Sequence, residues 1–384
     1  MRHQHDGIMV YLVRDLTEIV LKKLQPNKVI IVLGARRVGK TVLANEVLKQ
    51  IDEPILSLNG EDINTHEILN NRSVENYKKV LGSYKFLHID EAQKIPEIGL
   101  KLKLMVDSID SLKVLITGSS SFDLYKDAGE PLTGRKYSFK LFALSEHEYN
   151  QVENGVSKIE NVAHRLVFGN YPELLQIPNK EDKIDYLKEM VSSYLLKDIL
   201  VFESIKNSHV IFNLLKIIAF QIGGEVSMQE LGKQLGISKN TVEKYLELLQ
   251  KVFILHKVHG FSRNLRKEIT KNSRWYFLDN GIRNAVISNF NPIEMRNDIG
   301  ALWENYLISE RLKYQEYNRL WANNYFWRTY DQQEIDWVEE RDGKLFGYEF
   351  KWKNKNVKPP MQWKKAYPDS SFQVIHKDNF LEWL

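Results

Sequence analysis

The chain has 384 residues, which suggests two or three domains, and 43% of them are hydrophobic, enough for buried cores. The formal net charge of +4 neither requires nor excludes a nucleic-acid partner, and the absence of cysteine excludes disulfides and thiolate metal sites. The N-terminal MRHQHDG lacks the apolar core of a signal peptide, and the longest apolar stretch, near residues 210–222, is too short to span a bilayer. We therefore expect a cytoplasmic protein without membrane contact.

Short apolar runs alternate with helical patterns from residue 28 to about residue 150. The runs are VIIVLG, PILSLN, KFLHID, KVLITG and YSFKLF, at residues 29–34, 54–59, 85–90, 113–118 and 137–142. Continuous apolar strands separated by helices are typical of a parallel sheet covered on both faces. The sequence therefore predicts an α/β domain over residues 1–150, with a three-layer parallel sheet.

GARRVGKT, residues 34–41, directly follows the first run and opens a helix. This is the G-x-x-x-x-G-K-[ST] phosphate loop in its strand–loop–helix setting. Its glycines let backbone N–H groups point at phosphate oxygens, and the helix N-terminus adds a partial positive charge. Lys40 is expected to reach the β- and γ-phosphates, and Thr41 to hold Mg²⁺. The predicted nucleotide-binding residues are Gly34, Ala35, Arg36, Arg37, Val38, Gly39, Lys40, Thr41, Val42 and Asp90.

FLHIDE, residues 86–91, ends an apolar strand with two acids at the edge where open α/β sheets bind ligands. We expect Asp90 to hold Mg²⁺ through water and Glu91 to polarise the attacking water. A helix-capping acid pair is the alternative. The extra strand at residues 54–59, together with Glu91, points to the additional-strand, catalytic-glutamate division of P-loop ATPases.

Two further polar positions follow along the chain. In TGSSS, residues 117–121, the hydroxyl of Ser119 or Ser120 could bond the attacking water or the γ-phosphate, or it could simply cap the next helix. In LTGRKYSF, Arg135 stands just before the fifth strand. It could stabilise transition-state charge in its own subunit or in a neighbour's, or it could be an ordinary surface arginine.

GARRVGKT, FLHIDEAQKIP, LITGSSSF and LTGRKYSFKLFALSEHEY resemble the prokaryotic AAA-like ATPases that carry a C-terminal domain of unknown function. GNYPELL (169–175) and YLLKDI (194–199) are similar to the helical lid region of that family, which we place at residues 151–205. The resemblance covers nearly the whole chain. It implies ATP as the nucleotide, an AAA-type core with sheet order 5-1-4-3-2, and the capacity to form a homo-oligomeric ring. No clear second sensor arginine follows the lid, and Arg165 is the nearest candidate.

Residues 206–297 are expected to form a winged helix-turn-helix. Ser227 and Glu230 form a capping box, Gly236 ends the first helix, and Ser238 caps the second. The second helix exposes a face of mixed charge, namely Lys239, Asn240, Glu243, Lys244 and Glu247. A basic stretch that could be a wing follows, with Arg263, Arg266, Lys267, Lys271 and Arg274. DNA is therefore a candidate partner, while a structural or protein-contact module is the alternative.

Residues 298–384 contain EIDWVEERDGKLFGYEFKW, which alternates polar and apolar residues around a two-residue Asp342-Gly343 turn. Counting outward puts Asp336 opposite Glu349, and Glu334 opposite Lys351. The apolar face would hold Ile335, Trp337, Phe346, Tyr348 and Phe350. Like charges that face each other destabilise a sheet, but two carboxylates can share one Mg²⁺.

The order Asp336, then Glu349-x-Lys351, resembles the restriction-endonuclease-like nuclease core, and Glu304 in ALWENYLISERLKY resembles the helix acid of those enzymes. The resemblance implies Glu304, Asp336 and Glu349 as metal ligands, with Lys351 as a catalytic residue. An ordinary half-exposed hairpin with solvated acids is the alternative. Further lysines could track a phosphate backbone or form a solvated face: Lys353, Lys355, Lys358, Lys364 and Lys365.

Together these patterns predict a Mg²⁺-dependent ATPase coupled to a DNA-binding or nuclease-like C-terminal domain. The alternative is a nucleotide-dependent signalling or scaffold switch whose C-terminal domain binds a partner without cleaving it.

Overall fold

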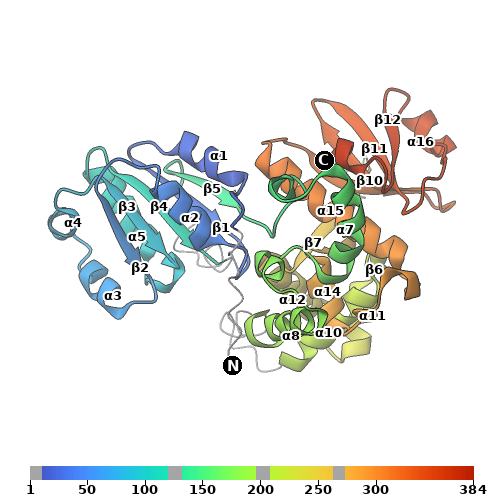
Figure 1. The fold of residues 1–384 in the computed structure, drawn as a ribbon, viewed down its shortest axis with the longest axis horizontal. Coiled ribbons are helices and arrows are strands. Elements are labelled where there is room, and N and C mark those ends of the chain that lie inside the picture. The colour runs from blue at the N-terminus through green and yellow to red at the C-terminus, as the bar shows by residue number, and fades with distance from the viewer. Residues whose placement is uncertain (1–10, 120–131, 196–207, 263–272) are drawn as a thin grey trace, which may run out of the picture.

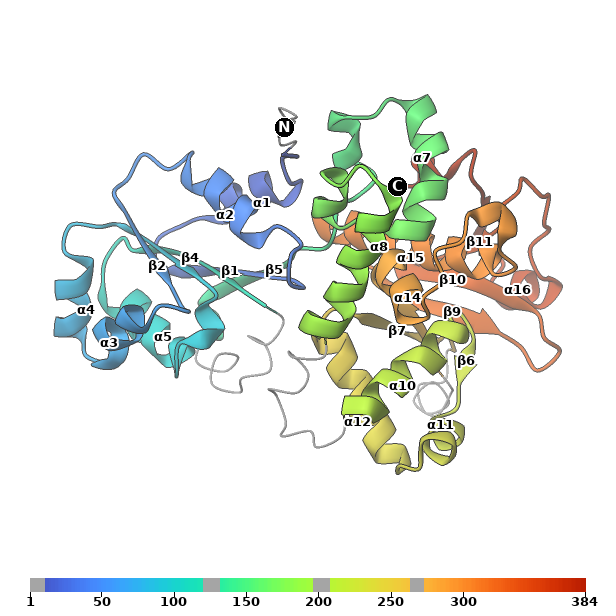
Figure 2. The same cartoon turned by 60° about the horizontal axis from the view of Figure 1, so that its bottom comes forward.

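The computed structural model describes residues 11–119, 132–195, 208–262 and 273–384. Within them lie two β-sheets, a five-stranded one near the N-terminus and a seven-stranded one formed by later segments. Figure 1 shows the two sheets on opposite sides of the molecule, and Figure 2 shows helices of the middle segment between them. In the described part of the chain, no helix combines the length and the apolar character needed to cross a membrane.

The N-terminal sheet is entirely parallel, and its order β2-β3-β4-β1-β5 confirms the predicted fold and the order 5-1-4-3-2. Its strands are β1 (Lys28–Leu33), β2 (Ile55–Asn59), β3 (Phe86–Asp90), β4 (Lys113–Gly118) and β5 (Lys136–Lys140). The helices are α1 (Leu16–Lys23), α2 (Lys40–Leu48), α3 (Ile63–Asn70), α4 (Val74–Leu81) and α5 (Ile98–Ser108), with the short η1 (Ala92–Lys94). One face of the sheet packs against α1 and α2 and the other against α4 and α5, which explains the continuous apolar strands.

A mostly helical segment follows. Its helices are α7 (Gly155–Phe168), α8 (Lys180–Glu189), α10 (Ser208–Phe220), α11 (Met228–Leu235), α12 (Lys239–Lys251) and α14 (Asn280–Val286). Short helical turns are η3 (Glu148–Gln151), η4 (Pro172–Leu175), η5 (Met190–Leu195) and η6 (Ile293–Met295), and the strands are β6 (Glu225–Val226), β7 (Leu255–Gly260) and β8 (Ser273–Phe277).

The predicted limits of α11 and α12 are confirmed by their caps. The Ser227 hydroxyl accepts a hydrogen bond from the backbone N–H of Glu230 at 3.3 Å, and Gly236 ends α11 with a left-handed φ of 68°. The Ser238 hydroxyl accepts from the N–H of Thr241 at 3.1 Å. These bonds satisfy N–H groups that a helix start otherwise leaves without partners.

The C-terminal segment contains α15 (Ile299–Tyr317), β9 (Asn323–Arg328), β10 (Glu334–Arg341), β11 (Lys344–Phe350), α16 (Met361–Ala366), β12 (Ser371–Ile375) and α17 (Phe380–Trp383). Its strands join β6, β7 and β8 in one sheet of order β12-β11-β10-β9-β7-β8-β6. The junction is a short parallel pairing of β7 with β9. The segment expected to be a wing and the C-terminal domain therefore share a sheet.

The β10–β11 hairpin forms as predicted, with Arg341 paired to Lys344 across a turn in which Asp342 and Gly343 have φ values of 50° and 73°. Its alternation, however, is interrupted. Between Ile335 and Val338 the pairing with β9 shifts by one residue, which is a β-bulge.

The bulge corrects the predicted apolar face. Ile335 packs with Val338 and Leu345 in a small separate cluster, whereas Trp337 and Tyr348 pack into the main core. Both faces of the hairpin are therefore covered. A half-exposed hairpin with solvated acids is also wrong, because Asp336 and Glu349 are only 6% and 9% exposed.

Candidate functional site

The phosphate loop joins β1 to α2 and needs glycine at two positions. A Cβ at Gly34 would lie 2.2 Å from the carbonyl oxygen of Leu141, so only glycine allows this close approach. Gly39 precedes α2 with a left-handed φ of 94°, a conformation that L side chains rarely adopt. The loop is thus curled against the sheet, with its last residue at the helix N-terminus.

Lys40 and Thr41 lie where the motif predicts. Lys40 is 5% exposed, and its Nζ donates to the carbonyl oxygens of Gly34 and Ala35 at 3.1 and 3.0 Å, so its side chain spans the loop. The Thr41 hydroxyl donates to Oδ2 of Asp90 at 2.8 Å. The structure therefore brings together the two residues that were expected to hold Mg²⁺, from α2 and from the end of β3.

Asp90 has further partners. Its Oδ1 accepts from the Thr117 hydroxyl and from the backbone N–H of Glu91, the latter at 3.0 Å. Thr117 lies at the end of the neighbouring strand β4, and the sequence reasoning did not assign it a role. A hydroxyl at the carboxyl end of a strand beside the acidic strand is the signal that could have identified it.

A cavity of about 950 Å³ lies beside the loop. The phosphate-loop side contributes Arg36, Arg37, Gly39, Lys40, Thr41 and Val42, and Glu91 also lines it. The other wall includes Tyr11, Leu12, Pro172 and Leu175, which offer apolar surface. Pro172 and Leu175 belong to the GNYPELL segment, and Arg37 is tied to Glu173 of that segment by an ion pair of 2.8 Å. The cavity thus combines a cationic loop with an apolar wall, and its volume is that of a small-molecule site.

Glu91 and Ser119 are connected through a residue that the sequence reasoning missed. Gln93 donates through Nε2 to Oε2 of Glu91 at 2.5 Å and to the hydroxyl of Ser119 at 3.0 Å. Glu91 itself has a left-handed φ of 47°. Ser120, the other candidate hydroxyl, lies outside the described residues.

Arg14 was also missed. It is 3% exposed. Its guanidinium donates to the carbonyl oxygen of Val38 in the phosphate loop at 2.5 Å and to that of Phe142, after β5, at 2.7 Å, so it connects the loop to the segment after β5. Its Nε forms an ion pair of 2.8 Å with the buried Glu148. No local motif marks this arginine, because all three partners are distant in sequence.

Arg135 lies at the end of the sheet where the parallel strands begin, whereas the phosphate loop lies at the end where they finish. Its carbonyl accepts from the N–H of Val29 at the start of β1, whereas the phosphate loop follows the end of that strand. Strands rise about 3.3 Å per residue, so roughly 15 Å separates the two ends. The Arg135 guanidinium pairs instead with Asp107 at 2.5 Å. A role for Arg135 at the nucleotide of its own subunit is therefore wrong, while action on a neighbouring subunit stays a prediction.

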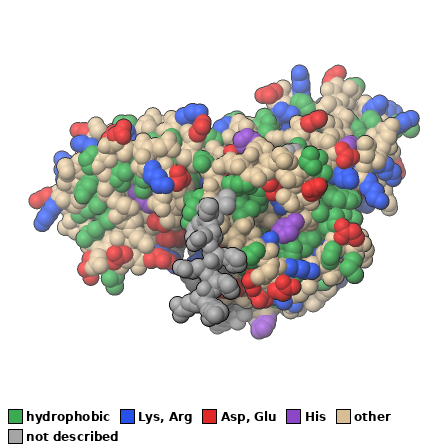
Figure 3. Space-filling model, in the orientation of Figure 1, with side chains coloured by type: hydrophobic (Ala, Val, Ile, Leu, Met, Phe, Trp, Pro, Cys, Tyr) green, Lys and Arg blue, Asp and Glu red, His purple; other side chains and the backbone are tan. Residues whose placement is uncertain are grey.

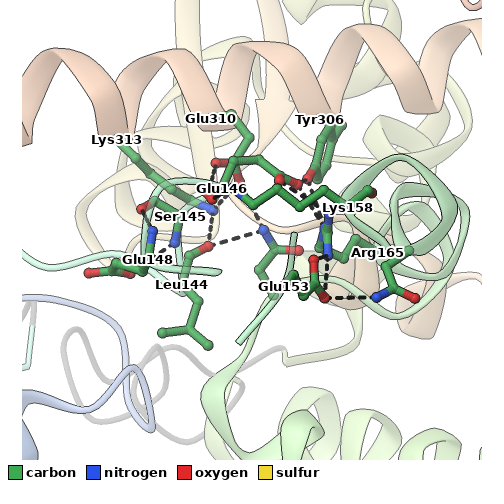
Figure 4. A network of polar contacts seen from close by, with 12 residues as sticks. Leu144, Ser145, Glu146, Glu148, Glu153, Lys158, Arg165, Tyr306, Glu310 and Lys313 are labelled. Atoms are coloured by element: carbon green, nitrogen blue, oxygen red, sulfur yellow. Dashed lines mark hydrogen bonds and ion pairs between the residues drawn. The ribbon is translucent and has the colours of Figure 1, made fainter. Parts of the chain in front are cut away.

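Arg165 does not act as a sensor in this structure. It is buried in α7, forms ion pairs with Glu146 and Glu153 at 2.7 and 2.9 Å, and donates to the Tyr306 hydroxyl at 3.2 Å. Figure 4 shows these residues in one polar network that joins α7 and α15 to the segment after β5. This position explains why no second sensor arginine reaches the cavity from here.

The second candidate site lies where β8, α15 and the β10–β11 hairpin meet. Oδ2 of Asp336 accepts from the backbone N–H of Phe350 at 2.8 Å. The backbone ladder of the hairpin ends at Trp337 and Tyr348, one pair before the expected pairing of Asp336 with Glu349. The carboxylate of Asp336 thus replaces a backbone acceptor at the bulge.

The other acids of this site already have cationic or hydroxyl partners. Lys351 pairs with Glu349 at 2.5 Å, and the Tyr276 hydroxyl donates to Glu304 at 2.6 Å. Arg274 pairs with Glu334 at 2.8 Å and lies 3.8 Å from Glu304. Arg274 is 4% exposed, so it is not part of an open basic wing, and the remaining basic residues of that stretch lie outside the described residues.

Burial raises the pKa of Asp336 well above its usual range, and the charges of Glu304 and Glu349 raise it further. Burial likewise raises the pKa of Glu304, although Arg274 and Tyr276 oppose the shift. The cluster therefore favours an added proton or cation. Among the described residues, however, no three His, Asp or Glu side chains are arranged to hold one metal ion together. The structure gathers the predicted acids but does not assemble them as a three-ligand site.

Comparison with known families divides the chain into three matches. Residues 26–150 match the AAA domain, residues 159–293 a domain of unknown function (DUF8612), and residues 299–380 another domain of unknown function (DUF4143). An uncharacterized protein of Mycobacterium tuberculosis is 24% identical over 342 residues, which cover 88% of this chain and 73% of the relative. An uncharacterized protein of Methanocaldococcus jannaschii is 26% identical over 285 residues, which cover 69% of this chain and 64% of the relative.

Two solved structures resemble parts of the fold. A signal transduction ATPase (STAND) protein with a tetratricopeptide repeat sensor from Pyrococcus horikoshii has a TM-score of 0.32 and 12% identity, covering 78% of this chain and 45% of that one. A Pif1 helicase from Bacteroides, in complex with ADP-AlF3 and single-stranded DNA, has a TM-score of 0.26 and 16% identity, covering 48% and 51%. The chain spans about half the length of each of these proteins.

The parallel sheet, its strand order and the loop between β1 and α2 define a P-loop nucleotide-binding protein. The AAA-domain match over residues 26–150 and the DUF4143 match over residues 299–380 agree with the predicted resemblance to AAA-like P-loop ATPases that carry a C-terminal domain of unknown function.

Proposed function

We propose that the protein binds ATP with Mg²⁺ and hydrolyses it in the cavity beside the phosphate loop. The observation that carries this proposal is the 2.8 Å contact between the Thr41 hydroxyl and Asp90, next to a cavity that Lys40 and Glu91 also line. A hydroxyl and a carboxylate are the hard oxygen ligands that suit Mg²⁺. When bound, the ion would neutralise charge on the β- and γ-phosphates.

The protein's own groups supply the remaining chemistry. Lys40, whose amine lies within the loop, places a positive charge beside the phosphates, and the N–H groups at the start of α2 face the same region. Glu91 accepts a hydrogen bond from the attacking water and orients it towards the γ-phosphate. The cationic wall formed by Arg36 and Arg37 favours an anionic ligand.

Calorimetry and a phosphate-release assay test this function. Lys40→Ala should abolish detectable ATP binding, whereas Glu91→Gln should bind ATP and lose turnover. Lys22→Ala is the matched control, because Lys22 is a lysine of α1 whose side chain is 75% exposed. ATP turnover that survives both Lys40→Ala and Glu91→Gln contradicts the proposal, as does wild-type protein that binds no ATP.

A second candidate function is metal-dependent cleavage of nucleic acid by the C-terminal domain. It is supported by the burial of Asp336 and Glu349 beside Lys351, at a β-bulge of the kind that often redirects side chains next to active sites. Plasmid nicking with Mg²⁺ or Mn²⁺ should occur with wild type and be lost in Asp336→Asn. Asp342→Asn is the matched control, because Asn-Gly preserves the hairpin turn.

Absence of nicking under every nucleotide condition favours the switch instead, in which the C-terminal domain binds a partner without cleaving it. The hydrogen bond from Tyr276 to Glu304 and the ion pairs of Glu334 and Glu349 support that alternative. In both the nuclease and the switch hypotheses, ATP turnover precedes the action of the C-terminal domain, which is either cleavage of nucleic acid or binding of a partner.

DNA is the partner we propose for the C-terminal half. α10, α11, α12 and the β6–β7–β8 strands have the order of a winged helix, and α12 exposes Lys239 and Lys244. Figure 3 shows Lys and Arg side chains gathered near α16, where five lysines are exposed: Lys353, Lys355, Lys358, Lys364 and Lys365. Duplex binding that weakens with rising salt, and weakens further when Lys353, Lys355 and Lys358 become Gln, supports this partner. Binding that does not depend on salt contradicts it.

A further inference from the structure

Gln93 lies between Glu91, which is expected to polarise the attacking water, and Ser119, whose hydroxyl is a candidate to bond that water or the γ-phosphate. It belongs to η1, two residues after Glu91, and is 7% exposed. Its Nε2 donates to Oε2 of Glu91 at 2.5 Å and to Oγ of Ser119 at 3.0 Å. An ionised carboxylate can only accept hydrogen bonds, so the amide nitrogen, not the amide oxygen, must face Glu91.

The opposite atom of the same amide is unsatisfied. Oε1 of Gln93 is buried and has no hydrogen-bond partner within the described residues. Leaving a buried acceptor without a partner is unfavourable, and most buried polar atoms avoid it. An apolar side chain of similar size would fill this position without that penalty. Stability alone therefore does not account for a glutamine here, which leaves its two donated hydrogen bonds as the reason.

Those two bonds fix the directions of a carboxylate and a hydroxyl that come from different strands. Glu91 follows β3 and lines the cavity with Lys40 and Thr41, while Ser119 follows β4. Glu91 also has a left-handed φ of 47°, a strained conformation for a residue with a side chain. Because the bond occupies Oε2, the carboxylate presents its other oxygen in a defined direction.

We propose that Gln93 is a positioning residue for ATP hydrolysis. It holds Glu91 and Ser119 at a fixed separation, so that both side chains can form hydrogen bonds with the same attacking water. This inference rests on the proposed ATPase function. A base that is itself oriented by a third group is a recurrent arrangement in catalytic sites. A misplacement of about 1 Å at such a site can lower a rate about 100-fold.

Gln93→Leu removes both donated bonds and also removes the unsatisfied oxygen. We expect kcat to fall about 10- to 100-fold, while the ATP dissociation constant measured by calorimetry stays within about twofold. The melting temperature should not fall, because the variant no longer buries an unpartnered acceptor. Replacing a residue with only a structural role would instead lower the melting temperature and leave kcat unchanged. Gln50→Leu, at an exposed glutamine in the turn after α2, is the control.

A double variant shows whether Gln93 acts through Glu91. Single-turnover hydrolysis is compared in wild type, Gln93→Leu, Glu91→Gln and Glu91→Gln with Gln93→Leu. We expect Gln93→Leu to cause little further loss once Glu91 is replaced, because residues that act as a unit are not additive. Gln93→Asn keeps the amide but shortens the side chain, so it should lose turnover in the same way and serves if the leucine variant does not fold.

Unchanged kcat in both Gln93 variants overturns the inference. So does an equal fold-loss in the wild-type and Glu91→Gln backgrounds, which would place Gln93 outside the action of Glu91. The wild-type measurement is read first. Wild-type protein without turnover contradicts the proposed ATPase itself and the inference with it, whereas normal wild-type turnover with insensitive Gln93 variants contradicts the inference alone.

Discussion

The hydroxyl of Tyr306, in α15, donates a hydrogen bond to the carboxylate of Glu146, in the segment that leaves the ATPase core after β5. Both side chains are buried, at 3% and 2% exposure. Glu310, one turn further along α15, accepts from the backbone N–H of Glu146 at 2.9 Å, and Lys313 donates to the carbonyl of Leu144 at 2.8 Å. The helix that carries Glu304 is thus fastened directly to the exit of the nucleotide-binding core, as Figure 4 shows.

Glu146 should make the stability of the protein depend on pH. Burial raises the pKa of Glu146 to about 7 from an ordinary value of 4.5; Arg165 and Lys158 oppose the shift, and Glu310 and Glu153 add to it. Between pH 4.5 and about pH 7, the folded protein therefore keeps a proton on Glu146 that the unfolded chain has released. This stabilisation, about 3 kcal/mol at most, is fully present below pH 4.5 and is lost as the pH rises through about 7.

Urea unfolding at several pH values, compared between wild type and Glu146→Gln, isolates this contribution. The difference in unfolding free energy should grow in favour of the glutamine variant between pH 5 and pH 8, since Gln stays neutral throughout. Comparing the two proteins removes the opposite effect of His164, whose pKa burial lowers to about 4. Parallel pH profiles for the two proteins contradict the prediction.

Removing Arg14 should destabilise the protein strongly. Glu148 is 0% exposed, and Arg14→Ala would leave its carboxylate buried without a cationic partner. Loss of one partner of a buried ion pair typically lowers the unfolding free energy by about 3–5 kcal/mol. Lys22→Ala, which breaks the exposed pair of Lys22 with Glu18, should change it by less than about 1 kcal/mol. Equal denaturant midpoints for the two variants contradict this assignment.

The phosphate site could be predicted from sequence because each of its parts is a short contiguous motif. The loop containing Lys40 and Thr41 and the strand ending in Asp90 each carry their own local pattern. The parallel sheet then brings the carboxyl ends of β1 and β3 to the same edge. The caps Ser227 and Ser238 were predictable for the same reason, since capping involves only neighbouring residues.

The features that the sequence did not predict depend on contacts between segments that are distant along the chain. The bulge that turns Ile335 away from Trp337 arises from pairing with β9, which the alternation within β10 does not encode. Arg14 reaches partners 24 to 134 residues away, and no spacing rule connects them. The sequence places Arg135 just before β5, but only the parallel pairing of β5 with β1 shows that the start of β5 lies at the end of the sheet away from the nucleotide.

Arg135 should act between subunits or not at all. Its distance from the phosphate loop excludes the nucleotide site of its own subunit, and its side chain is 38% exposed beside Asp107. Arg135→Ala and Lys40→Ala should each be inactive alone. A mixture of the two should regain part of the turnover, because an Arg135 from one subunit completes the intact loop of another.

Phosphate release across a series of mixing ratios measures this complementation, and light scattering reports the assembly that it requires. Glu18→Ala mixed with Lys40→Ala is the control, because Glu18 is exposed in α1 and should give turnover in simple proportion to its fraction. An active Arg135→Ala protein contradicts a catalytic role for this arginine in either subunit.

Asp336→Asn should have opposite effects with and without a divalent ion. Without metal, replacing a buried carboxylate beside Glu304 and Glu349 removes like-charge repulsion, and the asparagine oxygen can still accept from the N–H of Phe350. The melting temperature should therefore rise. With Mn²⁺ at 100 times its dissociation constant, wild type should gain about 2.7 kcal/mol, whereas Asp336→Asn should gain little because an essential oxygen ligand is lost.

The measurement uses thermal unfolding without nucleotide, in protein that also carries Thr41→Ala, so that the phosphate site does not contribute a second metal-binding event. Asp342→Asn, at the hairpin turn, should behave like wild type in both conditions. A manganese-induced gain that persists in Asp336→Asn would place the ion elsewhere. No gain in wild type would mean that Arg274 and Lys351 already balance these carboxylates, and the C-terminal domain would then act through binding alone.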